Sequence, residues 1–542
     1  MYKYTNYLFL LLIFGCSKSE SNNPIPINTF TLKEAKLNNS LLSTNPKGIP
    51  LNTEIILNFD ENISSSNINQ LIQLQDSKFA TLNTSVSSVN ETTIKIKSNS
   101  PLTALSTYHL ILHKDLKSVN GASLNQQYNY TFNTAIDSTD KFNRVSDDEL
   151  LTLVQKQTFK YFWDLAHPNS GMIRERNTSG ETVTTGGTGF GLMAIVTAIH
   201  RNFITRTEGL DRVKNIVTFL KKADKYHGAF SHWYNGSTGK TQPFSTKDNG
   251  ADLVETSLLF QGLLAAREYF NDTQLTQDIN KLYAEIEWSF FQNGQKALFW
   301  HWSPTYGWEM NLKISGWNES LITYVLAAGS DNHSIEKEVY DEGWTRNGAM
   351  KNGKSFNNII LPLGPDYGGP LFTSQYSFLG INPIGLKDSY ADYEQQVKNH
   401  TLINRAYCIQ NTKGYYGYSS ENWGLTASDI PNGYTASSPS NDLGIIAPTA
   451  ALASMAYTPT ESKAALNFFY YKLGDKLWSD YGFKDAFSLD QAWFADSYLA
   501  IDQGPIIVGI ENHRSKLIWN LVMKAPEIKK GLQKLGFTSP NL

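Results

Sequence analysis

Two acidic residues stand at the start of an apolar stretch, where their spacing could serve acid–base chemistry. Asp252 and Glu255 are three positions apart and are followed by a leucine-rich segment with helical spacing. On a helix these two carboxyls share one face. The alternative is that acids favour the first turn of a helix, where they meet the positive end of its dipole. That alternative suffices for Asp252 but explains Glu255 less well, since Glu255 stands among apolar neighbours.

A third acid, Glu319, directly follows Trp317 and Asn318 in a turn that begins with Gly316. Tryptophans are dense just upstream, and an apolar helical segment follows. A carboxyl packed among apolar rings has its charged form disfavoured, so its pKa rises. A raised pKa suits a general acid at a glycosidic oxygen. The competing interpretation is that Glu319 only begins a helix after an Asn cap, and the residues alone weigh the two evenly.

A fourth acid, Asp485, lies in the aromatic segment 481–487. Glycoside hydrolysis uses two carboxyls, one on each side of the scissile bond, so Asp485 is a candidate partner for Glu319. Asp502 and Glu511 lie near it in sequence and are alternative candidates.

Other chemistries lack their motifs. The sequence has no His-Glu-x-x-His motif and no Cys/His cluster, so we predict neither a metal nor a cofactor. The glycine-rich segment 186–191 lacks dinucleotide spacing and opens an apolar helix, which favours close helix packing or a substrate-facing loop. The formal net charge of -3 argues against a nucleic-acid partner. Aromatic residues make up 13% of the chain, and some of these rings are candidates for stacking on sugars.

The elements that must position these residues fall into two regions. Short runs rich in β-branched residues predict an all-β sandwich over 29–136. A polar linker is expected at 137–146, and from 147 to 537 the pattern is helical, with capping boxes at 146–149, 205–208 and 458–461. The predicted helices lie near 187–202, 206–224, 251–271, 275–292, 318–329, 389–402, 442–454, 459–472, 488–501, 505–521 and 525–535.

The N-terminus has the composition of a targeting segment. Lys3 precedes an apolar run too short to span a bilayer, and Gly15 stands directly before Cys16. This pattern resembles a bacterial lipoprotein signal, with residues 1–15 removed, Cys16 lipidated and residues 16–28 forming a tether. The alternative is a plain secretory signal. We therefore expect a secreted protein, anchored by lipid in the outer membrane or periplasm of a Gram-negative bacterium. The only other cysteine, Cys408, is expected to be a buried small hydrophobe.

Four segments in order resemble the bacterial glucoamylase-like domain family, which overlaps the β-1,2-glucanases of glycoside hydrolase family 144. They are residues 248–257, 316–320, 481–487 and 502–506. Segments 50–61, 105–108 and 130–134 resemble bacterial Ig-like modules, for which a spacer role is favoured over glycan binding.

The resemblance implies an (α/α)6 toroid over 147–537 that cuts β-1,2-glucan or its oligosaccharides with inversion. Glu319 would be the general acid and Asp485 the base, directly or through a relay, with Asp252 and Glu255 in the cleft. The expected partner is an oligo- or polysaccharide substrate. We expect a monomer that contacts the membrane only through its lipid anchor. Residues expected to contact sugar are Trp302, Trp308, Trp317, Asn318 and Phe483.

Two other functions stay open at this point. One is a non-catalytic glycan-binding lipoprotein of the cell surface, although such proteins typically use helical repeats that this sequence lacks. The other is a different reaction on the same toroid, such as an α-glucosidase or a polysaccharide lyase. The residues alone leave two properties open: which glycosidic linkage is cleaved, and whether cleavage is endo or exo.

Overall fold

A computed structural model describes residues 28–38 and 40–542. The predicted signal peptide, Cys16 and the tether up to residue 27 lie outside the described residues, so the lipid anchor stays a prediction. The chain divides into two compact units, one ending at Ala135 and the other spanning Ile136–Leu542. Within the described part of the chain, no helix is long and apolar enough to cross a membrane.

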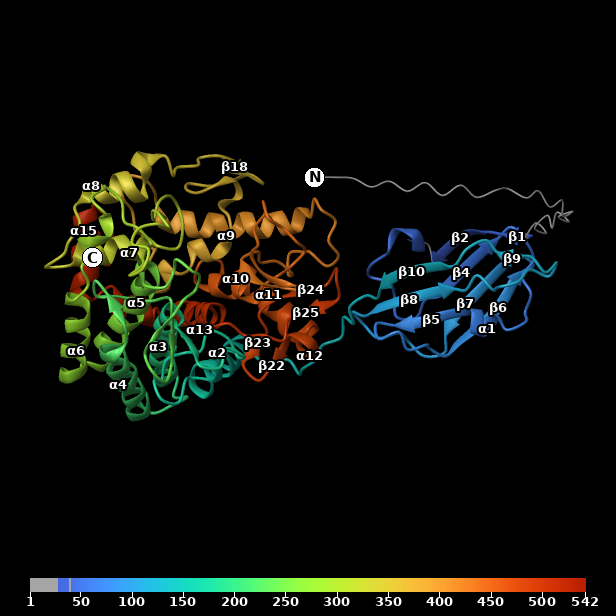
Figure 1. The fold of residues 1–542 in the computed structure, drawn as a ribbon, viewed down its shortest axis with the longest axis horizontal. Coiled ribbons are helices and arrows are strands. Elements are labelled where there is room, and N and C mark those ends of the chain that lie inside the picture. Colours follow the sequence, from blue (N-terminus) through green and yellow to red (C-terminus); the bar gives the residue numbers. More distant parts are fainter. Residues whose placement is uncertain (1–27, 39) are drawn as a thin grey trace, which may run out of the picture. The chain divides into compact units, whose positions relative to one another are not determined.

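The first unit is built from two antiparallel sheets around one core (Figure 1). Their strand orders are β3-β2-β4-β7-β6 and β10-β8-β5. Side chains alternate along the strands, so that in β4 Ile55, Leu57 and Phe59 are buried and the intervening residues are half-exposed. The strands are β2 Leu32–Leu37, β3 Ser40–Leu41, β4 Glu54–Phe59, β5 Ile72–Asp76, β6 Thr84–Asn90, β7 Thr93–Ser98, β8 Thr107–Leu112 and β10 Tyr128–Asn133. A short parallel pair joins β1 Thr29–Phe30 to β9 Ser123–Leu124.

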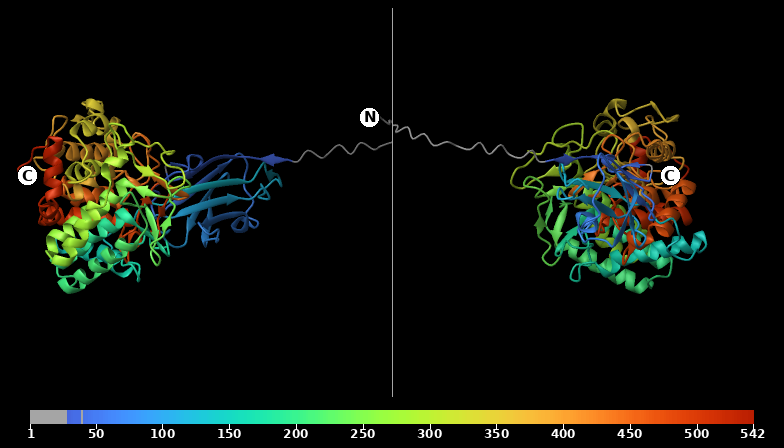
Figure 2. Two further views of the ribbon diagram at one scale, coloured as in Figure 1. Left: turned by 60° about the vertical axis from the view of Figure 1, so that its left-hand side comes forward. Right: turned by 90° about the vertical axis from the view of Figure 1, so that its right-hand side faces the viewer.

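The second unit is a large helical body with small sheets at its loops (Figure 2). The expected order of an all-β unit followed by a helical one is therefore confirmed. Its main helices are α2 Asp147–Asp164, α3 Thr185–His200, α4 Arg206–Lys222, α5 Leu253–Phe270, α6 Thr273–Ala284, α7 Leu321–Gly329, α9 Tyr393–Gln410, α10 Pro448–Leu452, α11 Pro459–Asn467, α13 Ala500–Arg514, α14 Leu517–Val522 and α15 Pro526–Leu535.

Two buried helices, α3 and α5, pack backbone to backbone at the centre of this unit. A Cβ atom on Gly262 of α5 would lie 2.0 Å from the carbonyl oxygen of Gly189 on α3, and one on Gly189 would lie 2.1 Å from the carbonyl oxygen of Leu258. No larger residue fits at either position without separating the helices. The glycine-rich segment 186–191 thus serves close helix packing, one of the two roles predicted for it.

The predicted helix ends are partly confirmed. Ser146 and Thr205 form the capping boxes expected before α2 and α4. Thr458 makes no side-chain cap hydrogen bond, although Pro459 does open α11. Cys408 is buried, as expected.

One predicted helix is wrong. Residues 488–501 do not form a helix: β24 Phe487–Ser488 pairs with β25 Trp493–Phe494 in a hairpin, and α13 begins only at Ala500. Ser488 accepts a hydrogen bond from the backbone N–H of Gln491, as a cap would, but the chain turns there and pairs back. A turn with the local sequence of a cap explains the error.

The predicted linker 137–146 is packed onto the helical unit. The ring of Phe142 lies 4.7 Å from that of Tyr470, and the guanidinium of Arg144 lies 4.6 Å from the ring of Tyr471. The N–H of Lys141 donates to the carbonyl oxygen of Tyr471 over 2.7 Å. These contacts meet the π-helical turn Phe468–Lys472, so this polar segment is part of the second unit and not a free connection.

Candidate active site

A cavity of about 500 Å³ opens in the helical unit and brings together three carboxyls and several aromatic rings. The carboxyls belong to Glu175, Glu255 and Glu319. A site of this size, apolar with a few polar groups, is typical of small-molecule binding. The aromatic residues that line it are Trp233, Phe244, Trp300, Phe372, Tyr376 and Tyr434.

Glu319 enters the cavity from the turn before α7. Asn318 shapes that turn, since its Oδ1 accepts a 2.9 Å hydrogen bond from the N–H of Ser320. Ser377 holds it from the other side by donating its hydroxyl to the carbonyl oxygen of Glu319. Burial of the side chain raises the pKa of Glu319 to about 7. At neutral pH this carboxyl therefore holds a proton in a large share of molecules, as a general acid requires.

Asp252 and Glu255 both lie at the start of α5 but do different things. Asp252 is the N-cap, and its Oδ1 accepts from the N–H groups of Val254 and Glu255 at 3.0 and 2.9 Å. Glu255 instead reaches α3, where its Oε2 accepts from the N–H of Gly186 at 2.7 Å. A Cβ at position 186 would lie 2.7 Å from that oxygen, so glycine is needed for this contact. Capping therefore accounts for Asp252, while Glu255 lines the cavity, and burial raises its pKa.

Two histidines surround Asp252. Nδ1 of His232 lies 3.1 Å from Oδ2 of Asp252, and Nε2 of His301 lies 3.5 Å from the same oxygen and 3.4 Å from Asp248. Burial opposes protonation, but the neighbouring carboxylates outweigh it and raise the pKa of His232 to about 9 and that of His301 to about 10. The two cations hold the pKa of Asp252 well below its usual range in spite of burial.

This cluster also has the spacing of a metal site. One ligand atom each from His232, Asp248 and Asp252 lie within 4.8 Å of one another. Imidazole must be neutral to bind a metal, so an ion here would have to displace the protons that His232 and His301 carry at neutral pH. The protons on His232 and His301 thus supply the positive charge that the two aspartates need.

Asp485 is buried and does not line the cavity. Its Oδ2 accepts a 2.7 Å hydrogen bond from the N–H of Asp429, and its carboxyl also meets that of Asp502. Two carboxyls can share a hydrogen bond only when one holds a proton. Burial raises the pKa of Asp485 to about 7, and burial together with Asp485 raises that of Asp502 well above its usual range. The pair therefore stores one proton near neutral pH.

Glu511, the other alternative to Asp485, is engaged elsewhere. Arg201 donates to both of its oxygens, at 2.7 and 2.9 Å, and Ser515 and Gln155 donate as well. Burial would raise the pKa of Glu511, but these donors lower it. Its role is to hold α13 against the end of α3.

The five residues expected to contact sugar do not line the cavity. Phe483 is fully buried against Phe469 and Trp478. Trp317 is buried against Trp344 and Phe378. Asn318 shapes the turn before Glu319, as described above.

The remaining two of the five pack into one ring cluster. Trp302 lies against His227 and Phe290, and Trp308 lies against Phe290 and Phe299. Contact of these five residues with sugar therefore stays a prediction that the lining of this cavity does not support.

Sequence reasoning missed the rings that do line the cavity. Trp233 and Phe244 pack on one another beside His232, with centroids 4.8 Å apart. Phe244 is 52% exposed and Tyr434 is 45% exposed. The sequence signal was weak, because nothing in their type separates these aromatics from core residues.

Comparison with known proteins gives matches along most of the chain. Residues 311–526 match the family described as "Putative glucoamylase", residues 35–134 match a bacterial Ig-like domain, and residues 154–275 match a family of unknown function. An exo β-1,2-glucooligosaccharide sophorohydrolase (non-reducing end) from Parabacteroides distasonis is 44% identical over 420 residues, which is 72% of this chain. The match spans 58% of the length of that relative.

Two solved structures are similar. The endo-β-1,2-glucanase of Chitinophaga pinensis, in complex with sophorotriose and glucose, is 50% identical, with a TM-score of 0.72 over 74% of this chain and 100% of that one. A β-1,2-glucanase from Parabacteroides distasonis is 36% identical, with a TM-score of 0.71 over 94% of this chain and 73% of the other.

Proposed function

The chain belongs to the glucoamylase-like family of the Chitinophaga pinensis enzyme, and on that premise we propose that it is a glycoside hydrolase acting on β-1,2-glucan or its oligosaccharides. Both resemblances seen in the sequence, to this family and to Ig-like modules, are confirmed by the matches. The observation that carries the proposal is the cavity carboxyl of Glu319, whose pKa of about 7 suits proton donation to a leaving oxygen.

The lining of the cavity suits a neutral sugar. Rings such as Trp233, Trp300 and Tyr434 offer flat apolar faces with polar edges, which stack on pyranose rings and bond their hydroxyls. The cation of Arg176 is balanced by ion pairs to Glu175 and Asp429 at 2.9 and 3.2 Å. The substrate of a lyase is an acidic sugar, and its carboxylate would not find an unpaired cation in Arg176.

We propose an inverting reaction with Glu319 as the acid. Water attacks the anomeric carbon while the bond to the leaving oxygen breaks, and that oxygen takes the proton of Glu319. The proton lost by the water passes to the Asp485–Asp502 pair. Because neither aspartate lines the cavity, this transfer needs an intervening water or substrate hydroxyl.

The remaining acids tune the site. Glu255 lies near enough to raise the pKa of Glu319 further, after burial, and its bond to Gly186 ties the start of α5 to the start of α3. Asp252 fixes the histidinium rings of His232 and His301 by lying beside both. We assign these residues to positioning and to electrostatics, not to proton transfer.

We also propose that the helices are arranged as an (α/α)6 toroid with the cavity at one end. Support comes from the buried core pair α3 and α5 and from the short hairpins that cluster at the loops. The Ig-like unit is proposed to be a spacer, the protein a monomer, and Cys16 the site of lipid attachment outside the cytoplasm.

The deciding experiment is a product profile on β-1,2-glucan, starch and laminarin side by side. We expect sugar release from β-1,2-glucan only. Disaccharide as the sole early product indicates exo cutting, and mixed lengths indicate endo cutting. Activity on starch without activity on β-1,2-glucan would overturn the substrate assignment, and binding without hydrolysis of any of the three would favour a glycan-capturing protein.

A further inference from the structure

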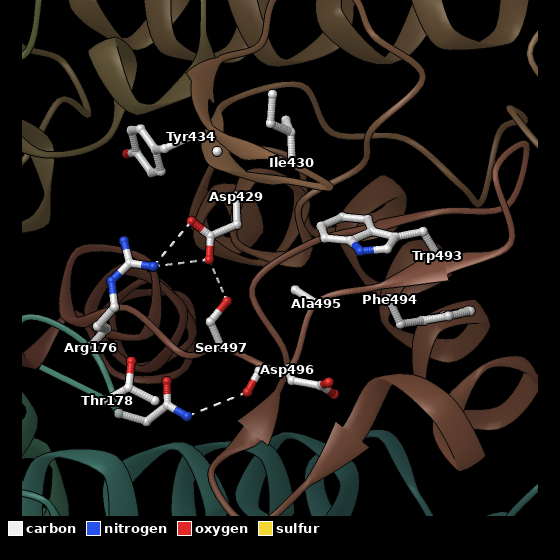
Figure 3. Close-up of a pocket in the computed structure, with 12 residues that line it drawn as sticks. Arg176, Thr178, Asp429, Ile430, Tyr434, Trp493, Phe494, Ala495, Asp496 and Ser497 are labelled. Atoms are coloured by element: carbon white, nitrogen blue, oxygen red, sulfur yellow. Dashed lines mark hydrogen bonds and ion pairs between the residues drawn. The ribbon is translucent and has the colours of Figure 1, made fainter.

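A second cavity, of about 580 Å³, adjoins the first in the helical unit (Figure 3). Arg176 and Tyr434 line both cavities, so the two share a boundary. Figure 3 shows Arg176 and Tyr434 on one side of Asp429 and the ring of Trp493 on the other.

Three chain segments run from the first cavity into the second. Glu175 and Arg176 line the first, and the chain continues through Asn177 to Thr178 in the second. The hairpin of β20 Ala427–Ile430 and β21 Gly433–Ala436 has the pair Ala427/Ala436 in the first cavity and the pair Ile430/Gly433 in the second.

The third segment runs backwards along the chain. Leu499 and Ile501 line the first cavity, and residues 493–497 line the second. Walls that continue in this way make one elongated cleft, not two unrelated hollows.

The second cavity has the chemistry of a sugar subsite. Trp493 is half-exposed and lines it, and within residues 28–38 and 40–542 no aromatic ring packs against the indole. Asp429 is held as a fixed acceptor by Arg176 and by the Ser497 hydroxyl at 2.5 Å. Asp496 pairs with Lys484 at 2.9 Å. The charges are therefore compensated, which favours a neutral ligand with hydroxyl groups.

We propose that this second cavity is a further glucan subsite, in which Trp493 stacks on a glucose ring of the same chain that Glu319 cleaves. The inference rests on the proposed function and deepens it. A short oligosaccharide is held by the first cavity alone, whereas a longer one spans both. Chain length thereby becomes a determinant of reactivity.

The test compares kcat/KM for a β-1,2-linked trisaccharide with that for longer oligosaccharides. Trp493→Ala is expected to lower the ratio of long to short substrate by about 2- to 10-fold, the range of one aromatic stacking contact. Trp493→Phe keeps a ring and should restore most of the ratio. The matched control is Trp163→Ala, since Trp163 is a half-exposed tryptophan on α2 outside both cavities.

A second variant narrows the cavity from the surface. Thr178 is exposed at its rim, so Thr178→Trp leaves the core intact and should also lower the ratio. Hydrolysis by the wild type with an unchanged ratio in both variants would overturn the subsite alone. Absence of both hydrolysis and binding of β-1,2-glucan by the wild type would overturn the proposed function together with it.

Discussion

The backbone N–H of Asp429 donates a 2.7 Å hydrogen bond to the carboxylate of Asp485. Asp429 belongs to the strand that walls both cavities, so the buried pair of Asp485 and Asp502 lies directly behind the cleft. This relationship makes Asp485 a candidate for proton transfer even though its side chain is 2% exposed.

Asp485→Asn tests that role. We expect kcat to fall about 100-fold or more, because the amide cannot accept the proton of the attacking water. Glu511→Gln is the comparison, since it changes another buried acid, one that is bound to Arg201 and lies outside both cavities. Breaking that ion pair should cost about 3–5 kcal/mol of unfolding free energy while leaving kcat of the folded protein near normal. An Asp485→Asn enzyme with normal kcat would remove Asp485 from the mechanism.

Glu319→Gln tests the acid. Its kcat on β-1,2-glucan should fall by about 100- to 10,000-fold. Aryl glycosides with acidic phenol leaving groups need little protonation, so their hydrolysis should fall far less. The control is Glu309→Gln in the preceding loop, where the side chain is exposed and paired with Lys247. An equal loss on both substrate types would contradict an acid role and point to a structural defect.

The pH dependence of stability offers an independent check on Glu319. Burial raises its pKa from 4.5 to about 7 in the folded protein. Between these values the folded protein holds a proton that the unfolded chain has released, so this group makes the free energy of unfolding fall as pH rises from 4.5 to 7.

The Gln variant lacks this dependence. Its melting temperature should rise relative to the wild type across that window and then stay level above it. A difference that does not change with pH would show that the glutamate is not buried as described. For the same reason the activity of the wild type should decline above pH 7, as the acid loses its proton.

Chelation should leave the enzyme unchanged. At neutral pH His232 and His301 hold protons, because their pKa values are about 9 and 10, so their nitrogens donate to Asp248 and Asp252. We expect EDTA to alter neither the melting temperature nor the turnover. A loss of activity that added Zn²⁺ or Ca²⁺ restores would show instead that the cluster binds a cation.

The contact of α3 with α5 predicts a stability effect away from the cavity lining. Gly262→Ala places a methyl group 2.0 Å from the Gly189 carbonyl oxygen, so the helices must separate. Overpacking of this kind costs about 1–3 kcal/mol, measurable by chemical denaturation. Gly294→Ala is the control for backbone strain alone, since no atom lies within 4 Å of its added Cβ and only its left-handed φ, at a cost of about 1 kcal/mol, opposes alanine. Equal effects of the two changes would argue against the close packing.

Local sequence predicted the acids of the cavity better than its walls. Glu255 and Glu319 were found because each stands where an apolar helix begins, and helix starts carry a strong local signal. Trp317 lies next to Glu319 in sequence and Phe483 next to Asp485, which suggests contact with sugar, but aromatic type does not tell a cavity wall from a core. Tyr434 and Trp493 reach the cleft from hairpins far along the chain, and only tertiary packing brings them there.

The docking of residues 141–145 onto the π-helical turn at 468–472 has a practical side. A shortened gene that encodes the helical unit alone would most simply begin at α2, near residue 147. In such a protein the rings of Tyr470 and Tyr471 would lose their contacts with Phe142 and Arg144, which would expose an aromatic surface prone to aggregation. A protein that starts at Asp137 keeps these contacts, so its yield of soluble protein should exceed that of a protein that starts at residue 147.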